Sequence, residues 1–112
     1  MKKNFVLANI LIFSFFQSFS QTTYYVAPSS SGGSDSNAGT LAAPFETLAH
    51  AIDQLTAGDI LYIREGTYRE TITIDEDGSS GNLITIQNYN NEVVTIDGTS
   101  DITGTWSTYG GV

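Results

Sequence analysis

The chain has 112 residues, enough for one domain at most, and it contains no cysteine, so disulfide bonds do not stabilise it. Twelve acidic residues oppose four basic ones, giving a formal net charge of −8. This acidity argues against nucleic acids and anionic membranes as partners, because both are bound by clusters of lysine and arginine. An acidic glycan remains compatible with the charge, since a bound cation can reverse the field locally.

The first twenty residues have the three-part pattern of a secretory signal peptide. Two lysines form the positive start, an apolar stretch covers residues 5–16, and Ser18 and Ser20 occupy the third and first positions before a cut at Gln21. The apolar stretch is shorter than the roughly twenty residues of a membrane span. We therefore expect cleavage between Ser20 and Gln21 and a secreted or cell-surface protein with no membrane attachment afterwards. A retained anchor is the alternative.

Residues 21–57 are expected to form an N-terminal cap. The run 22–28 is rich in Thr, Tyr and Val and predicts a strand that ends at a proline. Gly, Ser, Asn and Asp dominate residues 29–40, which predicts a solvated loop whose side chains bond nearby backbone. A cation site at Asp35 and Asn37 is the alternative, although oxygen ligands are too common in loops to be specific.

A helical period follows this loop. Apolar residues recur on one face at Phe45, Leu48, Ile52 and Leu55. Pro44 stands where a helix start tolerates proline, and Gly58 stands where a helix ends. We expect an amphipathic helix over residues 45–56 that covers the open end of the core. His50 lies off the apolar face, so an exposed position is favoured over a catalytic one.

Residues 58–112 contain four short β-type runs, at 60–63, 71–74, 83–87 and 93–96. A β-meander explains single strands equally well, and the spacing decides between the two arrangements. Ile60 and Ile84 are 24 residues apart, and Ile72 and Val94 are 22 apart. We therefore expect two incomplete coils of a parallel β-helix, with the first run stacked on the third and the second on the fourth. Ile74 should then point inward with Ile72.

These elements together resemble the N-terminal cap and first coils of secreted bacterial right-handed parallel β-helix proteins, which include pectate-lyase-like and other polysaccharide-degrading enzymes. The resemblance is carried by "YYVAP" at 24–28, "GSDSNAGT" at 33–40, "PFETL" at 44–48, "GDILYI" at 58–63, and Gly66, Tyr68 and Glu70. It implies an all-β solenoid, secretion and a polysaccharide partner. Such proteins usually have many coils, so we expect this sequence to be truncated, with the active site beyond it.

The resemblance implies a reaction less firmly than a fold. A lyase that cleaves pectate or alginate by β-elimination is favoured, with Ca²⁺ as a candidate cofactor of the full-length protein. A glycoside hydrolase and a non-enzymatic carbohydrate-binding or cell-surface protein are the alternatives. No position of this chain matches a catalytic motif of the family, so we assign no catalytic, cofactor-binding or metal-binding residue.

Several charged residues have both a catalytic and a structural interpretation. Elimination requires a group that neutralises the uronate carboxylate and a base that takes the C5 proton. Arg64, Arg69 and the acids of segment 75–78 are the residue types available. We expect instead that the arginines pair locally with Glu65 or Glu70, and that residues 75–78 form a solvated turn rather than a Ca²⁺ site.

Hydrolysis requires two carboxyl groups roughly 5 to 10 Å apart. Asp97 and Asp101 offer such a pair, but Asp97 with Gly98 more simply forms a turn. Trp106 and Tyr109 either stack on sugar rings or, in the case of Trp106, cover the next coil. The remaining tyrosines are expected to be packing residues on strands: Tyr24, Tyr25, Tyr62, Tyr68 and Tyr89.

Overall fold

The computed structural model describes residues 20–99, so nearly all of the expected signal peptide, together with Asp101, Trp106 and Tyr109, lies outside the described residues. The elements in order are β1 (Thr23–Val26), the 3-10 helix η1 (Ser29–Ser31), α1 (Leu48–Asp53), β2 (Ile60–Ile63), β3 (Gly66–Tyr68), β4 (Thr85–Asn88) and β5 (Val94–Ile96). None of the described helices combines the length and the apolar character that a bilayer crossing requires.

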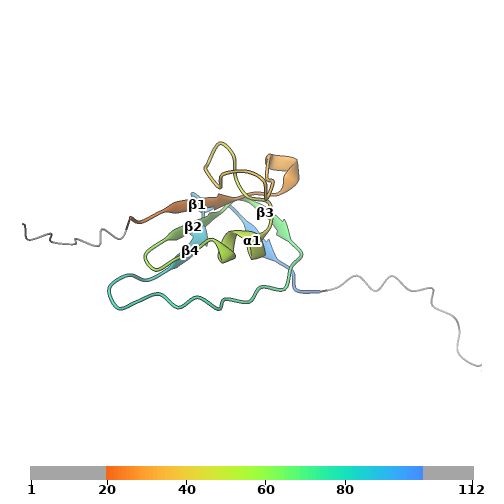
Figure 1. The fold of residues 1–112 in the computed structure, drawn as a ribbon. Coiled ribbons are helices and arrows are strands. Elements are labelled where there is room, and N and C mark those ends of the chain that lie inside the picture. Colours follow the sequence, from red (N-terminus) through yellow and green to blue (C-terminus); the bar gives the residue numbers. More distant parts are fainter. Residues whose placement is uncertain (1–19, 100–112) are drawn as a thin grey trace, which may run out of the picture.

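The strands form two parallel sheets. The first sheet has the order β1-β2-β4 and the second pairs β3 with β5. In Figure 1 the strands of the first sheet lie one below another, with α1 beside them. Ile60 lies opposite both Thr23 of β1 and Thr85 of β4. From β2 onward the chain contributes a strand to the first sheet and then to the second, and repeats this order once. The expected stacking of 60–63 on the third run is confirmed.

The second strand lies earlier in the chain than the sequence predicted. Residues 71–74 form no strand, and β3 occupies the segment that was expected to be a turn. Gly66 lies opposite Val94, so the second-sheet spacing is 28 residues rather than 22. Tyr68 is 3% exposed, whereas Ile74 is 58% exposed and does not point inward. Burial of the large Tyr68 ring therefore outweighs the intrinsic strand propensity of the β-branched run.

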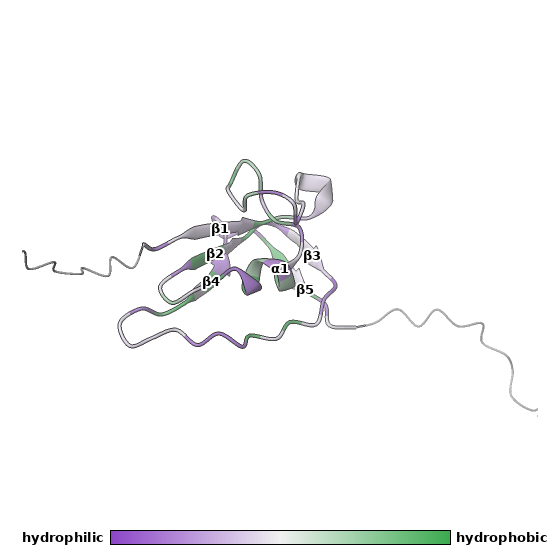
Figure 2. Ribbon diagram, in the orientation of Figure 1, coloured by the Kyte–Doolittle hydropathy of each residue, from purple (hydrophilic) through white to green (hydrophobic). Residues whose placement is uncertain are grey.

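One apolar core lies between the sheets and α1. Alternation in β2 buries Leu61 and Ile63 and leaves Tyr62 facing outward. The buried cluster comprises Val26, Phe45, Leu48, Ala51, Ile52, Leu55, Leu61, Ile63 and Tyr68. Figure 2 shows hydrophobic residues concentrated on β2 and part of α1. The apolar face of the helix therefore packs on the core, as the sequence predicted.

The helix is shorter than predicted, with six residues in place of the expected 45–56. Its N-cap is Thr47, whose hydroxyl accepts a hydrogen bond from the His50 backbone at 3.2 Å. Pro44 does not start the helix, because the backbone at Phe45 is extended and forms a bridge to Val26. The helix ends at Asp53, well before Gly58, which stands in the following turn.

The loop before the helix covers the free edge of β1. Tyr25 donates its backbone N–H to the carbonyl of Gly39 at 2.8 Å, and Ala27 donates to the carbonyl of Phe45 at 2.9 Å. Phe45 in turn donates to the carbonyl of Tyr25 at 2.9 Å. An uncovered strand edge exposes unpaired backbone groups that invite association. The loop is therefore more than a solvated connection, since it satisfies that edge while α1 covers the core.

Candidate functional site

The Asp35 carboxylate holds the chain at the start of α1. One oxygen accepts the backbone N–H groups of Glu46 and Thr47, both at 2.9 Å, and the other accepts the Thr47 hydroxyl at 2.8 Å. Partial burial raises the pKa of Asp35, but these hydrogen bonds outweigh it and bring the pKa below its ordinary value of 3.8. Asn37 donates its amide to the carbonyls of Gly32 and Pro44. The two residues therefore fix the loop through these hydrogen bonds.

Asp59 is a buried carboxylate that the sequence analysis missed. It is 2% exposed and accepts the Thr22 backbone N–H at 2.8 Å. Its second oxygen accepts both the backbone N–H and the hydroxyl of Thr56 at 2.9 Å. Burial raises the pKa of Asp59, and the hydrogen bonds from Thr22 and Thr56 overcome that effect and lower it. The available signal was the Thr three residues before Asp59, a spacing that permits local capping.

Glu70 contacts α1 from the segment that follows β3. Its two carboxylate oxygens accept the backbone N–H groups of Leu48 at 3.1 Å and Ala49 at 3.0 Å. These donors belong to the first turn of the helix and have no partner within it. Glu70 therefore caps the helix.

Arg64 pairs with Glu92, a residue distant in the sequence, and not with Glu65 or Glu70 as predicted. Its Nε donates to the two oxygens of Glu92 at 2.9 and 3.2 Å, and Glu92 also accepts the backbone N–H of Glu65 at 2.8 Å. The hydrogen bond with Glu92 is the main cause that raises the pKa of Arg64. The guanidinium also lies 5.2 Å from the centre of the Tyr89 ring. Arg64 is thus engaged in structural contacts.

The turn that carries Glu92 has an uncommon backbone. Asn90 and Asn91 have positive φ values of 46° and 59°, and Glu92 donates its N–H to the carbonyl of Tyr89 at 2.8 Å. Asparagine tolerates this left-handed conformation better than most residues. The turn therefore places Tyr89 and Glu92 together beside Arg64.

Replacing Glu92 by glutamine should lower the melting temperature only slightly. The Arg64–Glu92 pair is partly exposed, with 32% and 19% of the two side chains accessible, so water and salt screen it. Calorimetry in low and high salt checks this, because the difference between the wild type and the variant should shrink as salt rises. A large difference that salt leaves unchanged would contradict the expectation.

Arg69 follows β3, and Asp97 follows β5, the strand that pairs with β3. Arg69 Nε is 3.9 Å from an Asp97 oxygen, and 59% of the Arg69 side chain is exposed. The other Asp97 oxygen accepts the hydroxyl of Thr99 at 2.6 Å and its backbone N–H at 2.9 Å. The hydroxyl of Thr99 is the first cause that lowers the pKa of Asp97. Asp97 thus bonds within its own loop, and its candidate partner Asp101 lies outside the described residues.

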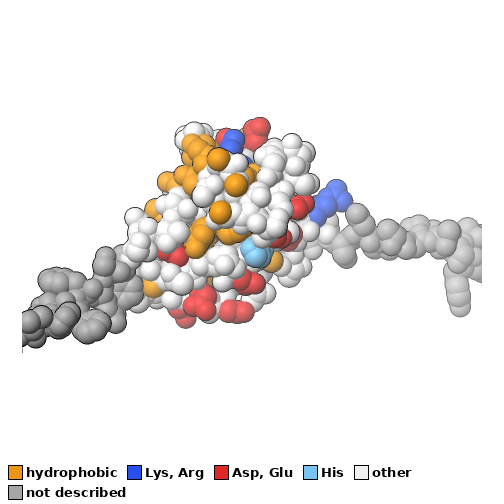
Figure 3. Space-filling view, turned by 45° about the horizontal axis from the view of Figure 1, so that its top comes forward, with side chains coloured by type: hydrophobic (Ala, Val, Ile, Leu, Met, Phe, Trp, Pro, Cys, Tyr) orange, Lys and Arg blue, Asp and Glu red, His pale blue; other side chains and the backbone are white. Residues whose placement is uncertain are grey.

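His50 is not exposed as predicted but half-buried. Its ring makes an edge contact with Phe45, with 4.8 Å between the ring centres, and Figure 3 shows the histidine beside hydrophobic side chains. The acids at 75–77 lie exposed on the segment between β3 and β4, as expected of a solvated turn. Within residues 20–99, no three His, Cys, Asp or Glu side chains gather where they could hold a metal ion.

The predicted packing of the tyrosines is confirmed, although Tyr89 lies just after β4 rather than on a strand. Tyr24 contacts Phe45 with 5.6 Å between ring centres. Tyr25 and Tyr62, which lie opposite each other on β1 and β2, stack at 5.5 Å, and the Tyr89 ring meets both edge-on at 5.6 Å. Such cross-strand aromatic pairs stabilise a sheet. These three rings form one outward-facing cluster on the first sheet.

The Tyr68 ring lies inside the core, and its hydroxyl donates to the carbonyls of Arg64 at 2.9 Å and Val26 at 3.3 Å. Burial raises the pKa of Tyr68 from 10.0 to about 12. The protonated Tyr68 hydroxyl therefore makes its full contribution to the free energy of unfolding below pH 10. This contribution is lost as the pH rises toward about 12, because in that interval the phenol ionises only in the unfolded chain.

A Tyr68→Phe variant should therefore lose about 1 kcal/mol at neutral pH, through the missing hydrogen bonds. It should also lose less stability than the wild type as the pH rises from 10 toward 12. Urea unfolding across this pH range measures both effects. Parallel pH profiles for the two proteins would show that the Tyr68 hydroxyl is not protected in the fold.

One open hollow brings charged groups together. It has a volume of about 280 Å³ and lies beside the start of α1, with Glu46, Arg69 and Glu70 in its lining. The Glu70 carboxylate is already bound to the helix backbone, and Arg69 approaches Asp97. The arrangement of the described residues therefore supports a scaffold whose charged side chains fasten the cap and the first strands.

The sequence of this chain matches a known protein family. Residues 24–110 match the profile of the Pel9A-like right-handed beta helix region, which is more than three quarters of the chain. The chain belongs to this family. The parallel β1-β2-β4 and β3-β5 pairings are the strand arrangement expected of such a region.

This Pel9A-like chain has two close matches among curated proteins. It is 50% identical over 76 residues to the uncharacterized protein YwoF of Bacillus subtilis, covering 68% of this chain and 16% of that protein. It is 42% identical over 76 residues to pectate lyase PEL9 of Emericella nidulans, covering 66% of this chain and 18% of the enzyme. The chain therefore spans less than one fifth of the length of these relatives.

Several solved structures superpose on part of this Pel9A-like chain. The complex of XylC with xylose superposes with a TM-score of 0.58 at 37% identity, covering 64% of this chain and 11% of that one. A rhamnogalacturonan lyase superposes with a TM-score of 0.54 at 30% identity, covering 67% and 21%. A glycoside hydrolase at 22% identity, with a TM-score of 0.60, shows similarity of fold alone.

Proposed function

We propose that this chain is the capped N-terminal end of a right-handed β-helix solenoid in a secreted protein that acts on an extracellular polysaccharide. The 42% identity to pectate lyase PEL9 carries the proposal. The geometry supports it, because a loop pairs with the free edge of β1 and α1 covers the adjacent core. At the other side, β4 and β5 each have one unpaired edge among the described residues, where further coils would continue the two sheets.

The favoured reaction is β-elimination on an acidic glycan of the pectate or alginate type. A base removes the C5 proton of a uronate, the bond from C4 to the leaving sugar oxygen breaks, and a double bond forms between C4 and C5. The leaving oxygen takes up a proton from an acid or from water. A cation, for which Ca²⁺ is the candidate, or a basic side chain must neutralise the uronate carboxylate. Residues 20–99 do not assemble such a set, because Arg64 and Asp35 are engaged structurally. We place the reacting groups on further coils.

An assay of the complete gene product tests this proposal. We expect the culture medium to contain the protein, and polygalacturonate or alginate to gain ultraviolet absorbance from the unsaturated product. New reducing ends without that absorbance would overturn elimination in favour of hydrolysis. Binding to the glycan without any cleavage would favour the carbohydrate-binding or cell-surface alternative. Repeating the assay with a chelator and then with added Ca²⁺ tests whether the cleavage requires this cation.

A further inference from the structure

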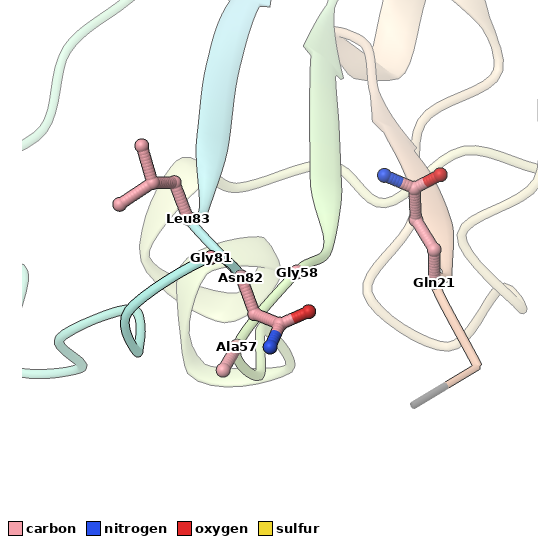
Figure 4. A pocket seen from close by; sticks show the side chains of 6 residues that line it. All are labelled: Gln21, Ala57, Gly58, Gly81, Asn82 and Leu83. Carbon is pink, nitrogen blue, oxygen red and sulfur yellow. The ribbon is translucent and has the colours of Figure 1, made fainter. Parts of the chain in front are cut away.

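A small pocket at the start of β1 is lined by two residues with amide side chains, Gln21 and Asn82. It has a volume of about 120 Å³ and is lined by Gln21, Ala57, Gly58, Gly81, Asn82 and Leu83. Figure 4 shows Gln21 on one side of Gly58 and Asn82 on the other, with the Gln21 side chain directed along the strands rather than toward the Asn82 amide. Gln21 itself is exposed. The pocket therefore adjoins the residue that the predicted signal cleavage makes the new chain end.

The backbone that follows Gln21 is firmly held. Thr22 donates its N–H to the buried Asp59 carboxylate at 2.8 Å and accepts the N–H of Ile60 at 2.9 Å. β1 begins with the next residue, Thr23. The residue next to Gln21 is thus anchored, which keeps the chain end near the pocket that Gln21 lines.

We propose that Gln21, once it is the amino-terminal residue, cyclises to pyroglutamate and that the closed ring occupies this pocket. This inference rests on the secretion that forms part of the proposed function and on the predicted cut before Gln21. The α-amine nitrogen attacks the side-chain amide carbon Cδ and forms the lactam C–N bond. The bond from Cδ to the amide nitrogen breaks, and that nitrogen leaves as ammonia with one proton from the α-amine. The step consumes no oxidant and no other reactant.

The pocket suits the product better than the free chain end. The five residues that line the pocket with Gln21 are uncharged, and an ammonium group that entered it would lose hydration, whereas a neutral lactam does not carry that cost. The lactam presents one N–H donor and one carbonyl acceptor, and the Asn82 amide can both accept and donate. Gly58 and Gly81 leave room, since a Cβ at Gly81 would meet no atom within 4 Å. The exposure of Gln21 leaves its amide accessible for the reaction.

Mass spectrometry of the protein purified from the medium tests the modification. We expect an N-terminal peptide that begins at residue 21, is lighter than the unmodified peptide by one ammonia and is blocked to stepwise N-terminal degradation. An unmodified Gln21 would overturn the inference and leave the cleavage intact. A chain that still begins at Met1 would overturn both the inference and the secretion it depends on. A start at any other residue would refute the predicted cut and the inference with it.

The matched control is Gln21→Asn, whose shorter side chain cannot close the five-membered lactam. It should be secreted at the same level but remain open to N-terminal degradation. The placement of the ring has its own readout, because the NMR signals of the Asn82 side-chain amide should differ between the wild type and Gln21→Asn. Identical Asn82 signals in the two proteins would overturn that placement.

Discussion

Replacing Leu61 by alanine is expected to lower the free energy of unfolding by about 3 kcal/mol. Leu61 has no exposed surface and lies on β2, the central strand of the first sheet. Tyr24 lies opposite it on β1, and Ile86 lies opposite it on β4. Neighbours held on both sides by parallel pairing cannot collapse fully into the space that a smaller side chain leaves, so the cavity persists.

Leu83→Ala is the matched control for this change. Leu83 precedes β4 and is 74% exposed, so the same chemical substitution should change stability by less than about 0.5 kcal/mol. Urea unfolding followed by circular dichroism measures both variants. If Leu61→Ala does not fold, Leu61→Val should still show a loss of about 1 kcal/mol. Equal effects at Leu61 and Leu83 would contradict the assignment of the core.

The apolar pattern of the sequence predicted the first sheet well. The run 60–63 alternates buried and outward residues, and its stacking partner is found at β4, 25 residues on rather than 24. The pattern failed at β3, where one large ring decides which residues face inward. Gly66 contributes there through its backbone, with φ at +148° and Pro28 so close that a Cβ would lie 2.5 Å from its Cγ. Neither the buried Tyr68 ring nor the conformation of Gly66 is visible in the sequence as a run of β-branched residues, so the pattern did not indicate β3.

The long-range partners of the carboxylates could not be inferred from the sequence for a different reason. Asp59 binds Thr22, 37 residues earlier, and Glu70 binds Leu48, 22 residues earlier. Arg64 finds Glu92 28 residues later, although Glu65 is its immediate neighbour. Only the fold creates these neighbours, so local spacing favoured the wrong partners. The Asp35 contacts also explain the short helix, because they hold Glu46 and Thr47 outside it.

Asp59→Ala is expected to cost about 3 kcal/mol at neutral pH, as much as the core substitution. The change removes the acceptor of the backbone N–H groups of Thr22 and Thr56. Water has almost no access to the Asp59 side chain, so it cannot readily replace the lost acceptor. Hydrogen bonds to a charged group contribute more than neutral ones, and an unsatisfied buried donor adds its desolvation penalty. The start of β1 should therefore detach from the turn before β2.

Asp53→Ala provides the control, since Asp53 is an exposed carboxylate on α1 and should change stability by less than about 0.5 kcal/mol. Hydrogen exchange of the β1 amides shows whether the loss is local to the Thr22 contact. Protection of β1 that is unchanged in Asp59→Ala would contradict the proposed role of the carboxylate.

The acid dependence gives an independent check on Asp59. Because its folded pKa lies below the ordinary 3.8, its stabilisation is complete above pH 3.8 and is lost as the pH falls through the folded pKa. The stability difference between the wild type and Asp59→Ala should accordingly be largest near neutral pH and narrow in acid. Asp35 titrates in both proteins and cancels in the comparison. A difference that stays constant down to acid unfolding would mean that shape, rather than the negative charge, is what this position contributes.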